Sequence, residues 1–204
     1  MTNNFLSKSY GKSTLESVRS HYDEWAASYD IEITENGYAT PGRCAAALSQ
    51  FSDDMAAPIL DFGCGTGLSG LALKLAGFET IDGLDLSADM LSGAKATGTY
   101  RNLDIIEPNA ALPHPDGTYA NIAAIGVIGA GAAPITVFHA LMRTLTTGGK
   151  LVFSLNDHAL ADPKNEGAIA EWTDCAAAHL LFKEHGDHLP GINLNSNVYV
   201  IEKA

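Results

Sequence analysis

The sequence predicts an α/β fold in which a mostly parallel sheet is covered by helices on both faces. Short apolar runs with the period of strands alternate with segments of about ten residues that have the period of helices. The runs are almost continuously apolar, which is typical of strands that are buried on both faces of a sheet. A glycine-rich turn joins the first run to the next helix, as is typical of doubly wound sheets.

The composition narrows the class of protein. The 204 residues are 46% hydrophobic and 18% charged, with a net charge of −12. Intrinsic disorder is excluded, and the acidic balance disfavours a nucleic-acid substrate or an anionic membrane surface. The three cysteines form no CxxC pair, so we expect reduced thiols, no metal site and a cytoplasmic protein.

Two segments bear on targeting and membranes. The first 14 residues are polar, so we expect no signal peptide. Residues 117–142 carry no formal charge, but their centre is rich in glycine and is followed by Pro134. This pattern would break a spanning helix, so it predicts a buried strand, a turn and the start of a helix.

A helical cap is expected before the first strand. One apolar stripe at spacings of three and four consists of Leu15, Val18, Tyr22, Trp25 and Tyr29. It predicts a helix, and a second helix follows Pro41 over residues 43–51. We therefore expect residues 1–204 to form one domain, with a cap at 1–56 and an α/β core at 57–204.

The core elements follow in alternation. Expected strands are 57–62, 80–86, 100–105, 120–128, 150–155 and 197–202. Expected helices are 68–76, 87–95, 134–145 and 166–183. Gly77 ends the first of these helices, Ser87 caps the second, and Gly148-Gly149 stops the third. Because such sheets bind ligands outside the carboxyl ends of their strands, the residues after each strand are the candidates for a site.

A glycine-rich loop and three acidic residues follow the first strands. The loop reads Asp61-Phe-Gly-Cys-Gly-Thr-Gly67, and its glycines let the backbone approach a ligand closely. Asp85 closes the second strand at the distance where a carboxylate accepts hydrogen bonds from both ribose hydroxyls of an adenosine cofactor. Asp104 ends the third strand, where it can meet the adenine amino group.

The glycines alone also match a dinucleotide fingerprint at Gly65, Gly67 and Gly70, so NAD stays an alternative cofactor. Two features favour a cofactor that carries an amino acid. Asp61 can receive an amino group or order the loop, whereas a pyrophosphate would be repelled by its carboxylate. Residues 1–56 precede the first strand, whereas dinucleotide domains often begin directly with it.

Four segments carry a resemblance to a known family, and the first of them is Tyr22-Asp-Glu-Trp-Ala-Ala-Ser-Tyr-Asp30. The segments Ile59-Leu-Asp-Phe-Gly-Cys-Gly-Thr-Gly67 and Gly83-Leu-Asp-Leu-Ser-Ala-Asp-Met-Leu91 resemble the first two motifs of class I S-adenosylmethionine-dependent methyltransferases. Thr146-Thr-Gly-Gly-Lys-Leu-Val-Phe153 resembles the segment through their fifth strand. The resemblance covers roughly residues 20–155 and is closest to the methyltransferase-like protein 27 group. It implies a Rossmann-like, seven-stranded sheet whose last strand, 197–202, is antiparallel.

The resemblance also implies a function. S-adenosylmethionine would be the cofactor, and a monomer or homodimer would transfer its methyl group to a small, neutral or cationic acceptor by in-line displacement. A non-catalytic S-adenosylmethionine-binding protein and an NAD-dependent oxidoreductase stay open as alternatives. The implied cofactor-binding residues are Tyr22, Tyr29, Arg43, Asp61, Gly63, Cys64, Gly65, Asp85, Leu86, Met90, Asp104, Ile105, Gly126 and Val127.

No catalytic residue follows from the sequence, because the loop 128–134 has no titratable side chain. Asn156-Asp157-His158 is a candidate for substrate contact or proton removal, with a polar loop as the alternative. The spacing of His179, His185 and His188 argues against a zinc site, because only one pair suits a shared helix face. Cys64 is expected to contribute backbone to its loop and not a nucleophile.

Overall fold

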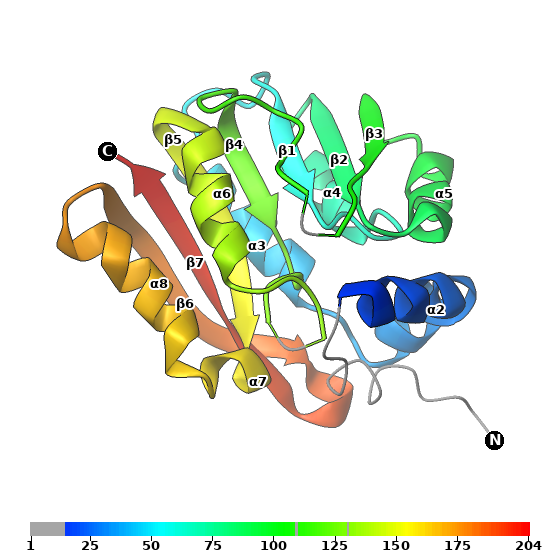
Figure 1. The fold of residues 1–204 in the computed structure, drawn as a ribbon. Helices are drawn as coiled ribbons and strands as arrows, with labels where there is room; N and C mark the ends of the chain where they lie inside the picture. The colour runs from blue at the N-terminus through cyan, green and yellow to red at the C-terminus, as the bar shows by residue number, and fades with distance from the viewer. Residues whose placement is uncertain (1–14, 109, 130) are drawn as a thin grey trace.

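A computed structural model describes residues 15–108, 110–129 and 131–204. Its strands form one seven-stranded sheet in the order β3-β2-β1-β4-β5-β7-β6 (Figure 1). The strands are β1 (Ile59–Phe62), β2 (Ile81–Asp85), β3 (Asn102–Ile105), β4 (Tyr119–Ala124), β5 (Leu145–Asn156), β6 (Ala178–Leu189) and β7 (Leu194–Lys203). β7 is antiparallel to both of its neighbours, which confirms the predicted Rossmann-like sheet with an antiparallel last strand.

Helices cover both faces of this sheet. They are α2 (Leu15–Glu35), α3 (Thr40–Ser49), α4 (Leu68–Leu75), α5 (Ala88–Ala96), α6 (Thr136–Thr144), α7 (Asp157–Leu160) and α8 (Pro163–Asp174), with a short 3-10 turn η1 (Pro190–Ile192). Figure 1 shows α6 and α8 on one face of the sheet and α3 and α4 on the other. It also shows α2 beside the carboxyl ends of the strands. In the part of the chain that the structure describes, no helix has the length and apolar character to cross a membrane.

The two hydrophobic cores follow from the alternation of side chains along the strands. Ile59 and Val152 pack with α3 and α4 on one face, whereas Leu60 and Phe153 pack with α6 and α8 on the other. All four side chains have no exposed surface. Because successive residues of a strand point to opposite faces, uninterrupted apolar strands build both cores at once, as the sequence predicts.

One expected helix is partly wrong. The segment 166–183 was predicted to be helical, but α8 ends at Asp174 and β6 begins at Ala178. Ala176 adopts a positive φ of 57°, which ends the helix. The first half of β6 is rich in residues that favour helices, and pairing with β7 along its length overrides that preference. The sequence predicts six strands, and β6 is the additional strand that makes seven. No local pattern in the sequence indicates it.

Two further boundaries also differ from the prediction. β4 was expected to reach residue 128, but it ends at Ala124. Residues 125–128 therefore form a loop at the carboxyl edge of the sheet. Gly148-Gly149 was expected to lie between a helix and a strand, but both glycines lie inside β5, where its pairing with β4 shifts register. Glycine is common at such irregular positions of a strand.

Candidate functional site

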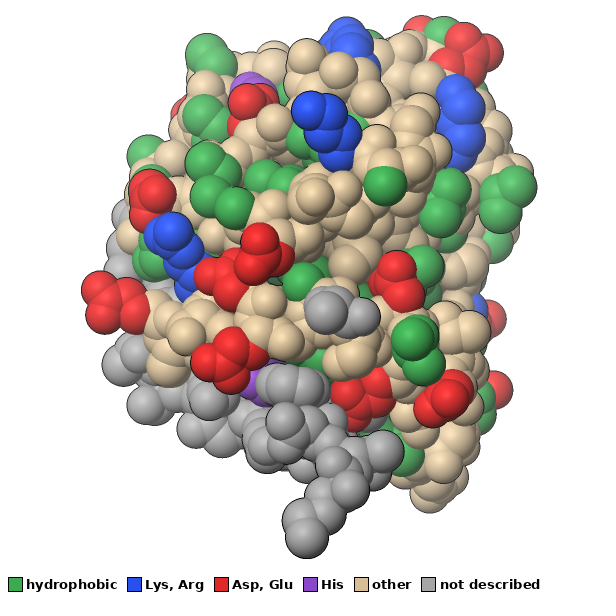
Figure 2. All heavy atoms as spheres, turned by 90° about the vertical axis from the view of Figure 1, so that its right-hand side faces the viewer, with side chains coloured by type: hydrophobic (Ala, Val, Ile, Leu, Met, Phe, Trp, Pro, Cys, Tyr) green, Lys and Arg blue, Asp and Glu red, His purple; other side chains and the backbone are tan. Residues whose placement is uncertain are grey.

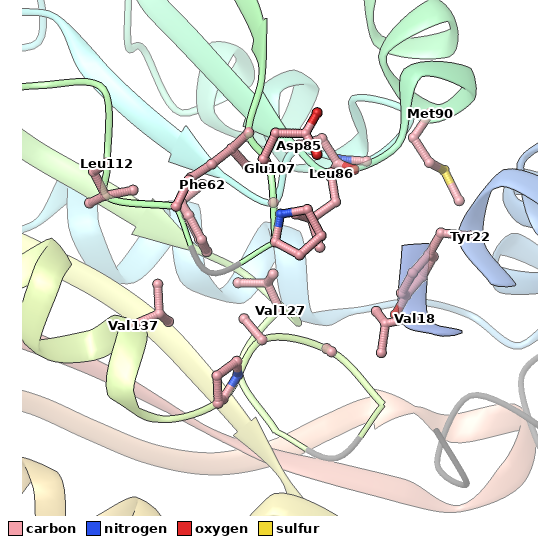
Figure 3. A pocket seen from close by; sticks show the side chains of 18 of the residues that line it. Val18, Tyr22, Phe62, Asp85, Leu86, Met90, Glu107, Leu112, Val127 and Val137 are labelled. Atoms are coloured by element: carbon pink, nitrogen blue, oxygen red, sulfur yellow. The ribbon is translucent and has the colours of Figure 1, made fainter. Parts of the chain in front are cut away.

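A cavity of about 320 Å³ lies at the carboxyl edge of the sheet. It is lined by residues that follow β1, β2, β3 and β4, together with residues of α2 and α6. The strand order reverses between β1 and β4, and open sheets of this kind bind ligands at that point. Figure 3 shows Val18 and Tyr22 facing the cavity from one side and Leu112 and Val137 from the other.

The glycine loop forms the floor of this cavity. Gly63, Gly65 and Gly67 adopt φ values of +70°, +54° and +101°, a region that residues with a side chain rarely occupy. A Cβ added to Gly63 would stand 2.2 Å from Cγ2 of Val127. The loop after β1 therefore packs directly against the loop after β4, and glycine is required at position 63 by both conformation and space.

Asp85 connects two of the loops that surround the cavity. Its Oδ2 accepts a hydrogen bond of 2.9 Å from the backbone N–H of Gly65, and its Oδ1 accepts one of 2.9 Å from that of Ser87. Burial raises the pKa of this carboxyl group, although the two backbone donors act in the opposite direction. Asp85 lines the cavity, so its carboxylate can accept further hydrogen bonds from a ligand.

Asp61 lies beneath the loop and does not line the cavity. Its Oδ2 accepts hydrogen bonds of 2.7 Å from the hydroxyls of Ser69 and Tyr100, while Oδ1 is buried and has no hydrogen-bond partner among the described residues. Burial raises the pKa of Asp61 to about 6. Of its two predicted roles, ordering the loop and receiving an amino group, these contacts support the first. A buried carboxylate oxygen without a donor also favours a nearby cation.

α2 covers one side of the cavity through two neighbouring stripes. Val18, Tyr22 and Tyr29 line the cavity, and burial raises the pKa of Tyr29, which keeps its phenol protonated. On the adjacent stripe, Asp30 accepts a hydrogen bond of 2.5 Å from the hydroxyl of Thr66 in the glycine loop. Asp23 accepts one of 2.5 Å from the hydroxyl of Ser87 after β2.

The opposite wall is apolar. It comes from the loop after β3, the loop after β4 and the first turns of α6, and it includes Leu112, Ala132, Ala133, Pro134, Thr136, Val137 and Ala140. Among the described residues of this wall, Glu107 is the ionisable side chain, and it also pairs with Arg19 of α2 at 3.1 Å. Residues 128, 129 and 131–134 bring no titratable group, as the sequence indicates.

The structure brings nine of the predicted residues together around the cavity. These are Tyr22, Tyr29, Gly63, Gly65, Asp85, Leu86, Met90, Gly126 and Val127. Cys64 is buried behind its loop, and Asp104 and Ile105 are exposed on the edge strand β3. Ile106 and Glu107 line the cavity in place of Asp104 and Ile105. Glu107 could have been found from the sequence, because it is an acidic residue just beyond the expected end of the strand.

Arg43 is not brought to the cavity. Its Nη1 donates to the carbonyl oxygen of Asp187 at 2.9 Å and to the hydroxyl of Ser196 at 3.1 Å. Its Nη2 donates to the carbonyl oxygen of Glu184 at 3.0 Å and pairs with the carboxylate of that residue at 3.2 Å. The guanidinium therefore joins α3 to β6 and β7, which matches the alternative of a structural ion pair.

The polar segment after β5 has structural contacts as well. Asn156 caps α7 by accepting a hydrogen bond of 3.0 Å from the backbone N–H of Ala159. Asp157 accepts one of 3.0 Å from the backbone N–H of Asn195. Neither residue lines the cavity. Among the described residues, no group of three or more His, Cys, Asp or Glu side chains has an arrangement that suits a metal ion.

His188 is a buried histidine at the end of β6. Its Nδ1 lies 2.7 Å from the hydroxyl of Thr40. Burial, followed by the charge of Arg43, lowers the pKa of His188 to about 4, with Asp157 acting in the opposite direction. Below pH 6.5 the unfolded chain binds a proton at this position that the folded chain does not take up until about pH 4. His188 therefore removes stability as the pH falls through this window.

We expect His188→Gln to reduce the loss of stability at acidic pH. Between pH 7 and pH 5 the wild-type protein should lose about 2 kcal/mol more of its free energy of unfolding than the variant, because glutamine does not titrate. Urea unfolding of both proteins at the two pH values measures the difference. Equal losses in the two proteins would show that His188 is protonated in the folded state.

Comparison with known proteins points to one family. A family model described as a methyltransferase domain matches residues 37–196. Methyltransferase-like protein 27 of Homo sapiens is 34% identical over 133 residues, which cover 62% of this chain and 53% of the human protein. The match thus spans about half the length of this curated relative.

Solved structures share the fold at low sequence identity. A chain of the complex between the Haloferax volcanii Trm112 methyltransferase activator and a methyltransferase is 17% identical, with a TM-score of 0.70 over 91% of this chain and 97% of that one. An S-adenosylmethionine-dependent methyltransferase from Mesorhizobium loti is 16% identical, with a TM-score of 0.56 over 77% and 96%. The [4+2]-cyclase SpnF is 17% identical, with a TM-score of 0.58 over 79% and 81%.

Proposed function

The chain belongs to the class I S-adenosylmethionine-dependent methyltransferase family, and from this premise we propose that it transfers a methyl group to a small, neutral or cationic acceptor. The observation that carries the proposal is Asp85. Its carboxylate lines the cavity at the end of β2 and holds the glycine loop through Gly65. A carboxylate in this position is suited to accept both hydroxyls of a ribose.

The residues around the cavity fit an adenosine cofactor that carries an amino acid. Apart from its two chain neighbours, no described residue has an atom within 4 Å of a Cβ added to Gly65, so the loop leaves room for a ligand against its backbone. Leu86 and Met90 provide apolar surface beside Asp85 for a base. The buried carboxylate of Asp61, with its unpartnered oxygen, favours a cationic ligand over a pyrophosphate.

Each group of residues has a role in this proposal. Asp85 binds the ribose hydroxyls, and Gly63 and Gly65 bind the amino-acid end. Tyr22 and Tyr29 exclude water on the side of the cavity that α2 covers. Residues 15–56 act as a cap, and residues 57–204 act as the cofactor-binding core. S-adenosylmethionine, when bound, supplies an electrophilic methyl group on a sulfonium. The protein then contributes position, orientation and exclusion of water.

The charges around the cavity support a neutral or cationic acceptor. Asp85 and Glu107 are carboxylates, and no Lys, Arg or His is among the described residues that line the cavity. Figure 2 shows more Asp and Glu than Lys and Arg on the side of the molecule that it presents. An anionic acceptor would meet repulsion both on approach and inside the site. Because the wall after β4 has no titratable group, the acceptor should need no base from that loop.

Calorimetric titration tests the cofactor. We expect S-adenosylmethionine and its demethylated product S-adenosylhomocysteine to bind with micromolar dissociation constants, and NAD to show no binding under the same conditions. A folded protein that binds neither sulfur compound would overturn the proposal. Tight binding of NAD alone would establish the oxidoreductase alternative that Gly65, Gly67 and Gly70 left open.

A second test concerns the acceptor. We expect release of S-adenosylhomocysteine when the protein and cofactor are incubated with a panel of neutral, cationic and anionic small molecules, and we expect activity with a neutral or cationic member. Binding of cofactor without transfer to any member would support the non-catalytic alternative. The lack of titratable groups in the wall after β4 favours that alternative. A [4+2]-cyclase also shares the fold, so methyl transfer has to be measured separately from cofactor binding.

The adenine end of the site gives a matched pair of variants. We propose that Glu107, which lines the cavity, takes the place at the adenine amino group that the sequence assigned to Asp104. Glu107→Ala should weaken binding of S-adenosylhomocysteine by about tenfold, the usual effect of one hydrogen bond to a charged group. Asp104→Ala should change it less than about twofold, because Asp104 is exposed outside the cavity. A larger effect of Asp104→Ala than of Glu107→Ala would support Asp104 as the partner of the adenine amino group.

A further inference from the structure

Tyr38 lies beside the cavity without having been indicated by any motif. Its hydroxyl oxygen stands 2.2 Å from the position that a Cβ would take on Gly126. Gly126 lines the cavity just beyond the end of β4 and has a φ of +70°. The ring of Tyr38 also packs in the cluster that contains Tyr22 and Tyr29, which both line the cavity. The phenol hydroxyl of Tyr38, in the connection between α2 and α3, thus lies against the loop after β4 at the edge of the cavity.

This position is where the two halves of the sheet meet. Gly63 follows β1 and Gly126 follows β4, and the strand order reverses between these two strands. Val127, next to Gly126, contacts the glycine loop at Gly63. Asp85 lies on the β2 side of this point, so a ligand held by Asp85 and the glycine loop presents its far end toward β4. The acceptor then has to approach on the side where Tyr38 lies.

Tyr38 and the two residues that follow it all contact His188. The rings of Tyr38 and His188 meet edge to face, with centroids 5.2 Å apart and planes at 82°. The backbone N–H of Ala39 donates to the carbonyl oxygen of His188 at 3.0 Å. The hydroxyl of Thr40 lies 2.7 Å from Nδ1 of the same residue. Thr40 is fully buried and His188 is 6% exposed.

The β6–β7 turn adds two contacts to this junction. The backbone N–H of Gly191 donates to the carbonyl oxygen of Asn36 at 3.0 Å. A Cβ added to Gly37 would lie 3.2 Å from Cγ of Pro190. The connection between α2 and α3 is therefore seated on the end of β6, and His188 is its central contact. Side chains fixed by packing and hydrogen bonds in this way are the ones that hold a precise geometry at a site.

We propose that the Tyr38 hydroxyl makes a hydrogen bond at the reacting end of the cofactor site, and that His188 is the positioning residue that holds it there. The proposal rests on the proposed cofactor site and adds a residue that the family motifs in this sequence do not contain. A neutral hydroxyl suits that place, because it can accept a hydrogen bond from a cationic group or donate one to an acceptor atom.

The test compares two ligands that differ only at the reacting atom. S-adenosylhomocysteine has a bare sulfur there, whereas sinefungin has a carbon that carries an amino group. Tyr38→Phe should weaken binding of sinefungin by roughly tenfold and binding of S-adenosylhomocysteine by less than about twofold, because only the amine of sinefungin loses a hydrogen-bond partner. Tyr199→Phe is the matched control, since it removes a buried phenol hydroxyl in β7 that contacts Asn197 and Glu166 and should leave both affinities unchanged.

The positioning role has its own pair of variants. His188→Leu removes a hydrogen-bond partner of the Thr40 hydroxyl and should weaken binding of sinefungin more than binding of S-adenosylhomocysteine. His188→Gln keeps a hydrogen-bonding side chain at this position and should restore most of the sinefungin affinity. Equal losses for both ligands in Tyr38→Phe, or no difference between the two His188 variants, would overturn the inference while the cofactor site stands. Failure of the wild-type protein to bind either ligand would overturn the proposed function and this inference together.

Discussion

Replacing Asp85 with alanine is expected to weaken binding of S-adenosylmethionine and S-adenosylhomocysteine by a hundredfold or more. The variant loses two hydrogen bonds from ribose hydroxyls to a carboxylate, each with a contribution of about 1.5–3 kcal/mol. It also leaves the backbone N–H groups of Gly65 and Ser87 without their acceptor, so the glycine loop loses its connection to the next loop. Calorimetric titration of the variant with both compounds measures the effect.

Two controls make the Asp85 result specific. Asp89→Ala removes an exposed carboxylate from the first turn of α5, close in sequence but outside the cavity, and should leave the affinities within about twofold. Thermal unfolding followed by circular dichroism shows whether Asp85→Ala is folded when it is titrated. Affinity within about threefold of the wild type would mean that Asp85 serves only as the structural link between its two loops.

Gly63→Ala is expected to have the second large effect. The added methyl group would stand 2.2 Å from Cγ2 of Val127, in a backbone conformation with a φ of +70°. Backbone strain and overpacking each cost about 1–3 kcal/mol, so the free energy of unfolding should fall by about 2–6 kcal/mol. Cofactor binding should be lost, because the loop has to move away from β4. Urea unfolding and titration with S-adenosylhomocysteine measure the two effects.

The structure offers a control and a rescue for this variant. Gly65 also has a positive φ, but no described residue beyond its chain neighbours lies within 4 Å of its added Cβ, so Gly65→Ala should cost only the backbone strain. Val127→Ala removes the nearest methyl group and leaves the Val127 Cβ at 2.8 Å. The double variant should therefore recover part of the stability that Gly63→Ala loses. Strictly additive effects would show that the collision with Val127 is not the cause.

The cap contributes contacts that a motif search does not find. Asp23 and Asp30 are seven residues apart on α2, and they accept hydrogen bonds from Ser87 and Thr66. These two hydroxyls belong to the same loops that Asp85 joins through Ser87 and Gly65. The helix and the loops therefore form one connected polar network around the cavity. The apolar stripe on α2 predicts the helix, but it does not indicate where the acidic residues lie.

The features that could be predicted from the sequence are those that depend on local chemistry. A glycine loop between a buried strand and a helix, and an acidic residue closing the next strand, predicted the fold class and the position of the cavity. These features depend on φ values, on strand and helix periods and on spacing along the chain. The same local chemistry identified Gly63, Gly65 and Asp85, which line the cavity as expected.

Contacts between residues far apart in the chain could not be predicted in this way and are seen in the folded structure. The tertiary structure placed Arg43 against β6 and β7, moved the cavity edge from Asp104 to Glu107, and brought Tyr38 and His188 together. It also made a strand of residues 178–183, the last part of a segment that the sequence predicts to be helical. The physical reason is the same in each case. Partners far apart in sequence meet through strand pairing and packing, and these contacts outweigh the weak preferences of single residues.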